Sequence, residues 1–317
     1  MTAPVKTLGN YTDTFLGGFE LSPFINQATL ELSFAVPKVT TLNDTLGVEY
    51  RCGLADGSLA LTGYFDGTAV TGWVLALNTA LGTNNNVVTH CPEGSATGKI
   101  AFLGQVSAKD WKTPTKTADF VTVSADFTLN LGWHFGALLE GLATVTTTGN
   151  GTAVDDGTGN TLTVSGATNA TPIVITTTAN HNMVTGNTVS IASVGGNTAA
   201  NGAWTVTVVS PTTFSLNTSV GNGVYTSGGT VFVDTLAGIL INQHITALTG
   251  TNYISVVKHS TDNISFTTLY TFASMTGIGA QTSGFVAGTI HRYLYENRGG
   301  TFSSVNRAIS YSRMAGG

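Results

Sequence analysis

Residues that could perform catalysis are few in this sequence and poorly spaced for it. His259, Ser260 and Asp262 are the residue types of a hydrolytic triad, but they lie within four consecutive residues of the chain. Triads are assembled from distant segments, because only the folded chain can align the three groups. We therefore interpret this stretch as an Asx or Ser/Thr turn between two strands.

The usual patterns of metal and cofactor chemistry are also missing. The six histidines are scattered, and none stands at i, i+4 spacing with a carboxylate. Asp155-Asp156-Gly157 could be half of a calcium loop, but no second carboxylate cluster lies nearby, so we interpret it as a turn. No GxSxG, HExxH, P-loop or GxGxxG-helix pattern occurs. The sequence therefore predicts no catalytic, cofactor-binding or metal-binding residue, and we do not expect an enzyme.

The charges are few and unevenly placed. Only 9% of the 317 residues are charged, and the formal net charge is −5. Residues 1–142 contain seven basic and twelve acidic residues, whereas residues 143–317 contain five of each. Between Asp156 and Asp234 there is no charged residue. These three patterns of charge along the chain indicate three modules. The first module is acidic and repels phosphates, which disfavours binding to nucleic acid.

Neither a disulfide framework nor membrane insertion is expected. Cys52 and Cys91 form no CxxC pair, and we interpret them as two small buried apolar residues. Whether the two are bridged stays open, because the sequence gives no distance. No run of about 18 apolar residues is present to span a bilayer. The first residues lack the apolar core of a signal peptide, so we do not expect export by that route.

Alternating apolar and polar residues predict strands. The alternation is regular over 28–36 and 121–130, the period of half-buried strands. Residues 58–65 and 99–106 are predicted as further strands between Gly, Asn and Pro turns. Short strands with Gly- and Asn-rich turns continue from 171 to the carboxyl end, which is typical of small barrels or sandwiches.

One stretch has the period of a helix. Residues 69–81 carry apolar side chains at three- and four-residue steps, which gives one apolar stripe. Thr68 can cap the first turn, and Gly82 can take the left-handed position after the last. The first module is therefore predicted to be a sheet or sandwich with one helix across it.

The order of these elements resembles a known family. Asn10-Tyr11, the segment Phe19–Ser22, strand 28–36, a long connection and Gly53–Phe65 precede the helix, and a later strand pair follows it. In these features residues 8–140 resemble the tail tube (major tail) proteins of long-tailed bacteriophages. The motifs are strand patterns and contain no reactive groups.

A second resemblance covers residues 171–233. It is carried by His181–Asn187, Asn201–Val206, Thr213–Leu216 and Tyr225–Val231. These segments resemble the small β-barrel known as the first catalytic cysteine half-domain of ubiquitin-activating enzymes, which recurs as a decoration in phage structural proteins. The segment has no cysteine, so the resemblance implies a fold and no ubiquitin chemistry.

Together the resemblances imply a mainly β chain of three modules. A tail-tube-like β-sandwich with one packed α-helix would span 1–142. Residues 143–170 and 234–317 resemble the carboxy-terminal β-sandwich of some tail proteins, on Gly151–Gly157 and Val257–Asn263. The small barrel, 171–233, would be an insertion into that sandwich.

The function implied is structural. Members of the family form hexameric rings that stack into the hollow tail tube, and DNA passes through it without specific binding. The expected partners are further copies and the tape measure, tail terminator and distal tail proteins, in a virion tail assembled in the host cytoplasm. Within the connection 37–50, Lys38, Asp44 and Glu49 are the expected ring-stacking residues. The outer modules, which carry few charges and many Thr, Asn and Gly residues, suit either weak glycan contact or an inert coat.

Two other classes stay open. The first is a virion decoration or receptor-contacting, fibre-like protein built as a trimer; the predicted helix and the acidic first module favour the tube over it. The second is a secreted carbohydrate-active enzyme, which needs paired carboxylates in a cleft. Residues 143–317 hold only five acidic residues, which leaves few candidates.

Overall fold

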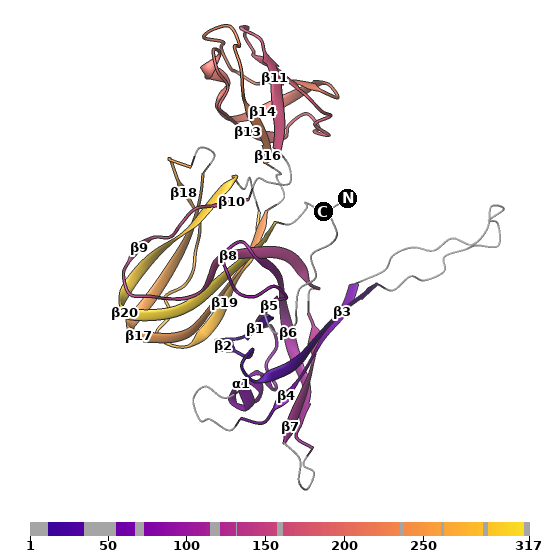
Figure 1. The fold of residues 1–317 in the computed structure, drawn as a ribbon, viewed down its shortest axis with the longest axis vertical. Coiled ribbons are helices and arrows are strands. Elements are labelled where there is room, and N and C mark those ends of the chain that lie inside the picture. Colours follow the sequence, from indigo (N-terminus) through magenta and orange to yellow (C-terminus); the bar gives the residue numbers. More distant parts are fainter. Residues whose placement is uncertain are drawn as a thin grey trace, which may run out of the picture.

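The computed structural model describes residues 12–34, 55–66, 73–114, 121–130, 132–156, 161–234, 238–260, 263–287 and 291–313. In these ranges fourteen strands form one continuous sheet and six others close into a barrel. Figure 1 shows the barrel at one end of the molecule and the strands β3 (Ile25–Phe34), β4 (Ala55–Tyr64) and β7 (Thr122–Leu129) at the other. The predicted mainly β fold with one packed helix and a small barrel is confirmed.

The amino-terminal part of the sheet divides at one long strand, β6 (Ile100–Lys112). Val106 of β6 pairs with Asn86 on one side and with Leu129 of β7 on the other. Beyond β7 the order continues to β4 and then β3. The remaining strands of this part are β1 (Asp13–Leu16), β2 (Phe19–Glu20), β5 (Asn86–Cys91) and β8 (His134–Val145).

The helix α1 (Trp73–Ala80) covers one face of this divided sheet. Its buried residues Ala76, Leu77 and Ala80 pack in one core with inward-facing residues of β4 and β7, among them Leu61 and Phe127. The helix stops at a glycine: Gly82 has φ +74°, a conformation that costs other residues more because they carry a Cβ. The predicted C-cap is therefore confirmed, and the predicted cap Thr68 lies outside the described residues.

The carboxy-terminal part is built on two very long antiparallel strands, β17 (Ile239–Ser260) and β20 (Tyr293–Arg313). Their register shifts near Gly250, and the two halves of β17 then face each other, since Ile241 and Val257 lie in the same core. This bend makes two layers from one hairpin. The short strands β9 (Gly149–Asn150), β10 (Val154–Asp155), β18 (Thr267–Thr271) and β19 (Gly279–Val286) pair along its edges.

The barrel contains six strands in the order β11, β12, β15, β14, β13, β16. Their bounds are β11 (Thr161–Ala167), β12 (Val174–Thr177), β13 (Thr188–Ala192), β14 (Gly202–Ser210), β15 (Thr213–Leu216) and β16 (Thr230–Asp234), with a short 3-10 helix at Thr198–Ala200. Its core is apolar and includes Ile175, Val206 and Phe214, all fully buried.

The strand boundaries differ from the expected modules at two points. β11 belongs to the barrel, so the barrel begins at Thr161 and not at residue 171. β8 runs across the expected boundary at residues 142 and 143, and it pairs with β6 on one side and with β20 on the other. The sheet is thus continuous between the first two parts, because one strand completes both.

Candidate functional site

The free edges of the amino-terminal sheet are the candidate site, because backbone groups there have no partner strand in the part of the chain that the structure describes. Among the described residues β3 pairs with β4 alone. The alternation of hydrogen bonds shows which groups point outward. Tyr64 N–H donates to Phe24 O (3.0 Å), on the β3 side, and Phe65 N–H donates to Val121 O (2.8 Å), on the β7 side. Even-numbered residues of β4 therefore bond to β3 and odd-numbered ones to β7.

The register transfers this alternation to β3. Thr29 lies opposite Ala60, an even-numbered residue, so the backbone of Thr29 bonds to β4. Ala28 lies opposite the odd-numbered Leu61, so its N–H and C=O point to the free edge. A row of such groups is a template for another strand.

A second free edge lies at the end of β6. On the side away from β7, the only pairing of Ala108–Lys112 among the described residues is a single bridge between Ala108 and Leu81. Trp111 lies opposite Ala125 of β7, whose own bonds go to β4. The backbone groups of Trp111 therefore point to this second edge.

The two faces of the four strands β6, β7, β4 and β3 differ in polarity. One face packs against α1 and the core. The register places Thr29, Ala60, Asp126 and Asp110 in one row across the opposite face, and Glu31 in the next row. Asp110 forms an ion pair with Lys112 at 3.1 Å. This outward face thus carries small polar residues and carboxylates, together with Lys112 and the exposed side chain of Tyr64.

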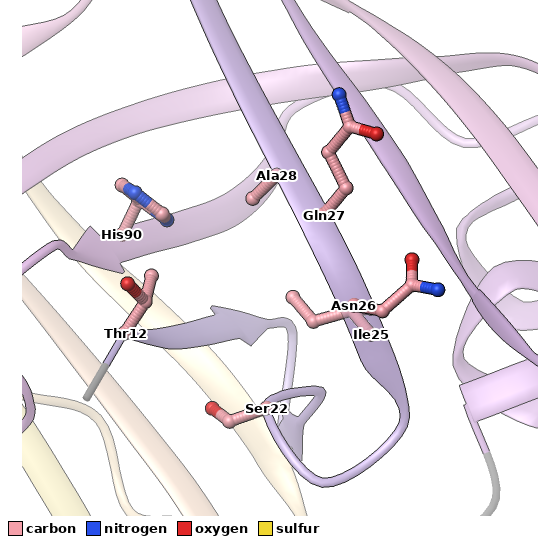
Figure 2. Close-up of a pocket in the computed structure, with 7 residues that line it drawn as sticks. All are labelled: Thr12, Ser22, Ile25, Asn26, Gln27, Ala28 and His90. Carbon is pink, nitrogen blue, oxygen red and sulfur yellow. The ribbon is translucent and has the colours of Figure 1, made fainter. Parts of the chain in front are cut away.

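A pocket of about 360 Å³ opens on the inward side of β3. Figure 2 shows Ile25 and Ala28 pointing across it toward Thr12 and His90, while Gln27 points to the other side of the strand. The remaining lining residues are Ser22 and Asn26. Among the described residues no strand other than β4 pairs with β3, so the pocket is lined by a strand at the free edge of the sheet.

A buried polar network fixes the amino-terminal sheet to the long hairpin. His244 Nδ1 lies 2.6 Å from Gly17 O, and Thr89 Oγ1 lies 2.9 Å from His244 Nε2 and 3.0 Å from Ser310 Oγ. Because a carbonyl only accepts, Nδ1 carries the hydrogen. The lowered pKa of the buried ring keeps His244 neutral near pH 7, so Nε2 then accepts from the Thr89 hydroxyl. Burial lowers the pKa of His244 to about 4, and it lowers the pKa of His90 to about 4 as well.

These histidines predict a loss of stability in acid. Unfolded histidine binds a proton near pH 6.5, and folded His244 binds one only near pH 4, so the unfolded state takes up more protons as the pH falls from 6.5 to 4. The difference corresponds to about 3 kcal/mol. The melting temperature should fall over this window, and less steeply in His244→Gln, when both are followed by circular dichroism. Equal slopes for the two proteins would contradict this role of His244.

A buried ion cluster lies inside the bent hairpin. Arg307, 1% exposed, contacts Glu296 Oε2 at 2.7 Å and Glu140 Oε2 at 3.0 Å, and the hydroxyl of Tyr253 donates to Glu296. Burial alone would lower the pKa of Arg307, but Glu296, Tyr253 and Glu140 raise it above its usual value. The cluster joins β8, β17 and β20, so we interpret it as structural.

Several residues singled out in the sequence have structural roles. Asp155 accepts two hydrogen bonds of 2.7 Å from Arg292, and Asp156 pairs with Arg313 and Tyr311. Ser260 Oγ accepts from Asn263 N–H at 3.1 Å, as in a Ser/Thr turn. No group of three metal-binding side chains occurs within the described ranges.

Other predicted residues lie outside the described part of the chain. These are Lys38, Asp44 and Glu49, with Cys52 and Asp262. Cys91 is buried, and burial raises the pKa of its thiol to about 12. In the part of the chain that the structure describes, no helix is both long and apolar enough to cross a bilayer.

No family model matches the sequence, and no curated protein matches it. Among solved structures, a chain of the virion of a native gene transfer agent particle is 9% identical, with a TM-score of 0.33 over 41% of this chain and 98% of the other. A chain of a PVC extracellular contractile injection system sheath–tube complex is 11% identical, with a TM-score of 0.34 over 42% and 92%. The phage SPP1 Dit protein is 9% identical, with a TM-score of 0.30 over 96% and 99%. Similarities at these scores carry no conclusion about function.

Proposed function

We propose that this protein is a structural, non-enzymatic subunit of a bacteriophage tail, and that it polymerises as stacked hexameric rings into the tube that conducts DNA. The observation that carries the proposal is the pair of free edges, β3 and the end of β6, on one four-stranded sheet. The ring number and the DNA-conducting role come from the resemblance of residues 8–140 to tail tube proteins.

The two edge strands run in opposite directions, so they can pair between copies in an antiparallel manner. The strands β6, β7, β4 and β3 are each antiparallel to the next, so β6 and β3 run in opposite directions. When copies are related by rotation about an axis along the strands, β3 of one copy meets β6 of the next in antiparallel pairing. Closing a ring in this way removes both edges from solvent, which is how symmetric assemblies protect such strands.

The polar face supports a lumen on the side away from α1. The helix and the carboxy-terminal part occupy the other face, so only the face with Glu31, Asp110 and Asp126 is free to line a channel. Carboxylates repel DNA phosphates, whereas basic groups would bind them with release of counterions. Acidic and hydroxyl groups therefore suit a wall past which DNA slides.

Reversing this charge should slow the passage of DNA. Asp126→Lys should leave tubes intact, because the new lysine faces Asp110 in the register. DNA release from virions that carry the variant should slow by roughly tenfold or more, with partial recovery in high salt. Release is timed by dye fluorescence, with Glu93→Lys, a partly exposed site paired with Lys99, as the control. Unchanged release would exclude Asp126 from the lumen wall.

The remaining assignments follow the same proposal. Lys38, Asp44 and Glu49 are proposed to contact the next ring, and the tape measure, tail terminator and distal tail proteins to bind the tube. The protein would reside in the virion tail after assembly in the host cytoplasm. The wall of the tube is proposed to be residues 1–142, and the projecting sandwich residues 143–170 with 234–317. The inserted barrel is proposed as residues 171–233, and its strand β11 extends it to Thr161.

The alternative is a fibre-like decoration that contacts a receptor or glycan. The barrel at one end of the molecule, whose one formally charged residue is Asp234, is the feature that favours it. However, the aromatic side chains of the described barrel are buried or half-buried, and the Trp204 indole donates to Ala200 O (2.9 Å). No open aromatic platform for a sugar is present among these residues.

Electron microscopy of the purified protein tests the proposal. Hollow tubes or six-fold rings are expected at high protein concentration. Isolated monomers would contradict the proposed tube, and trimers would favour the fibre-like alternative.

A further inference from the structure

We infer that neighbouring copies are held together by an apolar seam in which Trp111 and Leu81 of one copy pack against Ala28 and Leu32 of the next. The inference deepens the proposed tube function and rests on it. It assigns specific side chains, on the core side of the sheet, to the contact between copies.

Both free edges carry exposed apolar residues on the inward face. Leu32 of β3 is 47% exposed although its neighbour in the register, Gly57, is buried. Leu81 is 46% exposed and lies beside the β6 edge, where it bridges to Ala108. Their near neighbours in the chain, Leu30 and Ala80, belong to one core, so the two leucines extend that core toward opposite edges of the sheet. Exposed apolar side chains at two complementary edges indicate a surface that another copy covers.

When copies join, the apolar residues of both edge strands lie on the same side of the joined sheet. Directly opposed residues point to the same side of a sheet, so the stagger between copies must be even to keep apolar side chains on the core side. Ala28, Leu61, Ala125 and Trp111 already form one row across a single copy. Without stagger, Ala28 of one copy meets Trp111 of the next.

The backbone supports the same pairing. Ala28 and Trp111 are residues whose N–H and C=O groups point to their respective free edges. A contact between them therefore makes backbone hydrogen bonds and places both side chains on the core side at once. A one-residue slip would lose both features.

The pocket supplies room for the incoming side chain. It has a volume of about 360 Å³, and Ile25 and Ala28 point into it from β3, as Figure 2 shows. A tryptophan at this position would shield the pocket from the open side, and tryptophan is among the residues that contribute most at interfaces. Leu81 of the same neighbouring copy then meets Leu32 further along β3.

A second copy is the occupant that these observations favour. The four side chains of the seam are uncharged, and both halves of the contact are present on one chain in antiparallel directions. A different protein that paired with β3 or with β6 would cover one of these edges and leave the other edge of this chain open.

The test is a charge exchange across the seam. Leu32→Glu and Leu81→Lys are each expected to reduce tube or ring formation at least tenfold, because each places an unpaired charge against the leucine of the other copy. The double variant is expected to recover most of the assembly, since the introduced carboxylate of one copy can pair with the introduced ammonium group of the next. Assembly is measured by sedimentation and electron microscopy, and folding by the melting temperature.

Two outcomes would overturn the seam. Normal assembly of Leu32→Glu would place Leu32 outside the contact, and a double variant no better than the single ones would show that Leu32 and Leu81 do not meet. Val224→Glu, at a barrel position that is 74% exposed, is the matched control and should assemble normally. If the wild-type protein forms tubes and either of these two outcomes is found, the seam is refuted and the proposed tube is not. If the wild-type protein does not assemble at all, the proposed tube itself is refuted.

Discussion

Replacing Ala28 by proline should abolish assembly and leave the subunit folded. Proline lacks the N–H group, and in Ala28 this group points to the free edge and not to β4. The fold thus keeps its ladder between β3 and β4, while the proposed junction loses a hydrogen bond and leaves a carbonyl of the next copy unsatisfied. The loss is about 1–3 kcal/mol for each junction, which weakens each contact roughly 5- to 160-fold.

The matched control for this variant is one residue away. Thr29→Pro removes an N–H that bonds to Ala60, so it should lower the melting temperature of the subunit itself. Ala28→Pro should melt close to the wild-type protein and fail to sediment as rings or tubes. Tubes from Ala28→Pro would mean that β3 is not the joining edge.

Replacing Arg307 by methionine should destabilise the subunit by about 3–5 kcal/mol, because Glu296 would be left buried without its partner. The carboxylate is fully buried, so water cannot replace the guanidinium. A drop of roughly 10 °C in the melting temperature is expected from this loss. Thermal denaturation followed by circular dichroism measures it.

An exposed ion pair provides the comparison. Lys99 lies 3.7 Å from Glu93, and both side chains are partly exposed. Lys99→Met should change the free energy of unfolding by less than about 1 kcal/mol. A similar effect of both substitutions would show that the cluster around Arg307 is not a stability determinant.

The sequence predicts local elements well where one face is clearly buried. The alternation over 28–36 and 121–130 corresponds to β3 and β7, and the helical stripe corresponds to α1. The short turns between 171 and 233 correctly indicate closely spaced strands. In each case side-chain burial follows directly from the period of the backbone.

Pairings between distant segments could not be read in this way. β17 and β20 are strands of 22 and 21 residues, but their bend puts different faces inside at the two ends, so the alternation is interrupted. Burial of Arg307 and Glu296 depends on that bend, and nothing local marks either residue as buried. Which strands form the free edges could not be predicted for the same reason: whether a strand is an edge depends on which partners it finds, which its own residues do not encode.

The attachment of the barrel has a consequence for how such a chain can diversify. Thr161, at the start of β11, pairs with Phe232 near the end of β16, so the chain enters and leaves the barrel at neighbouring points. A module whose two ends are adjacent can be exchanged for another, or lost, with little displacement of the remaining sheet. The barrel can therefore be replaced in one recombination step that leaves the pairing of the other strands unchanged.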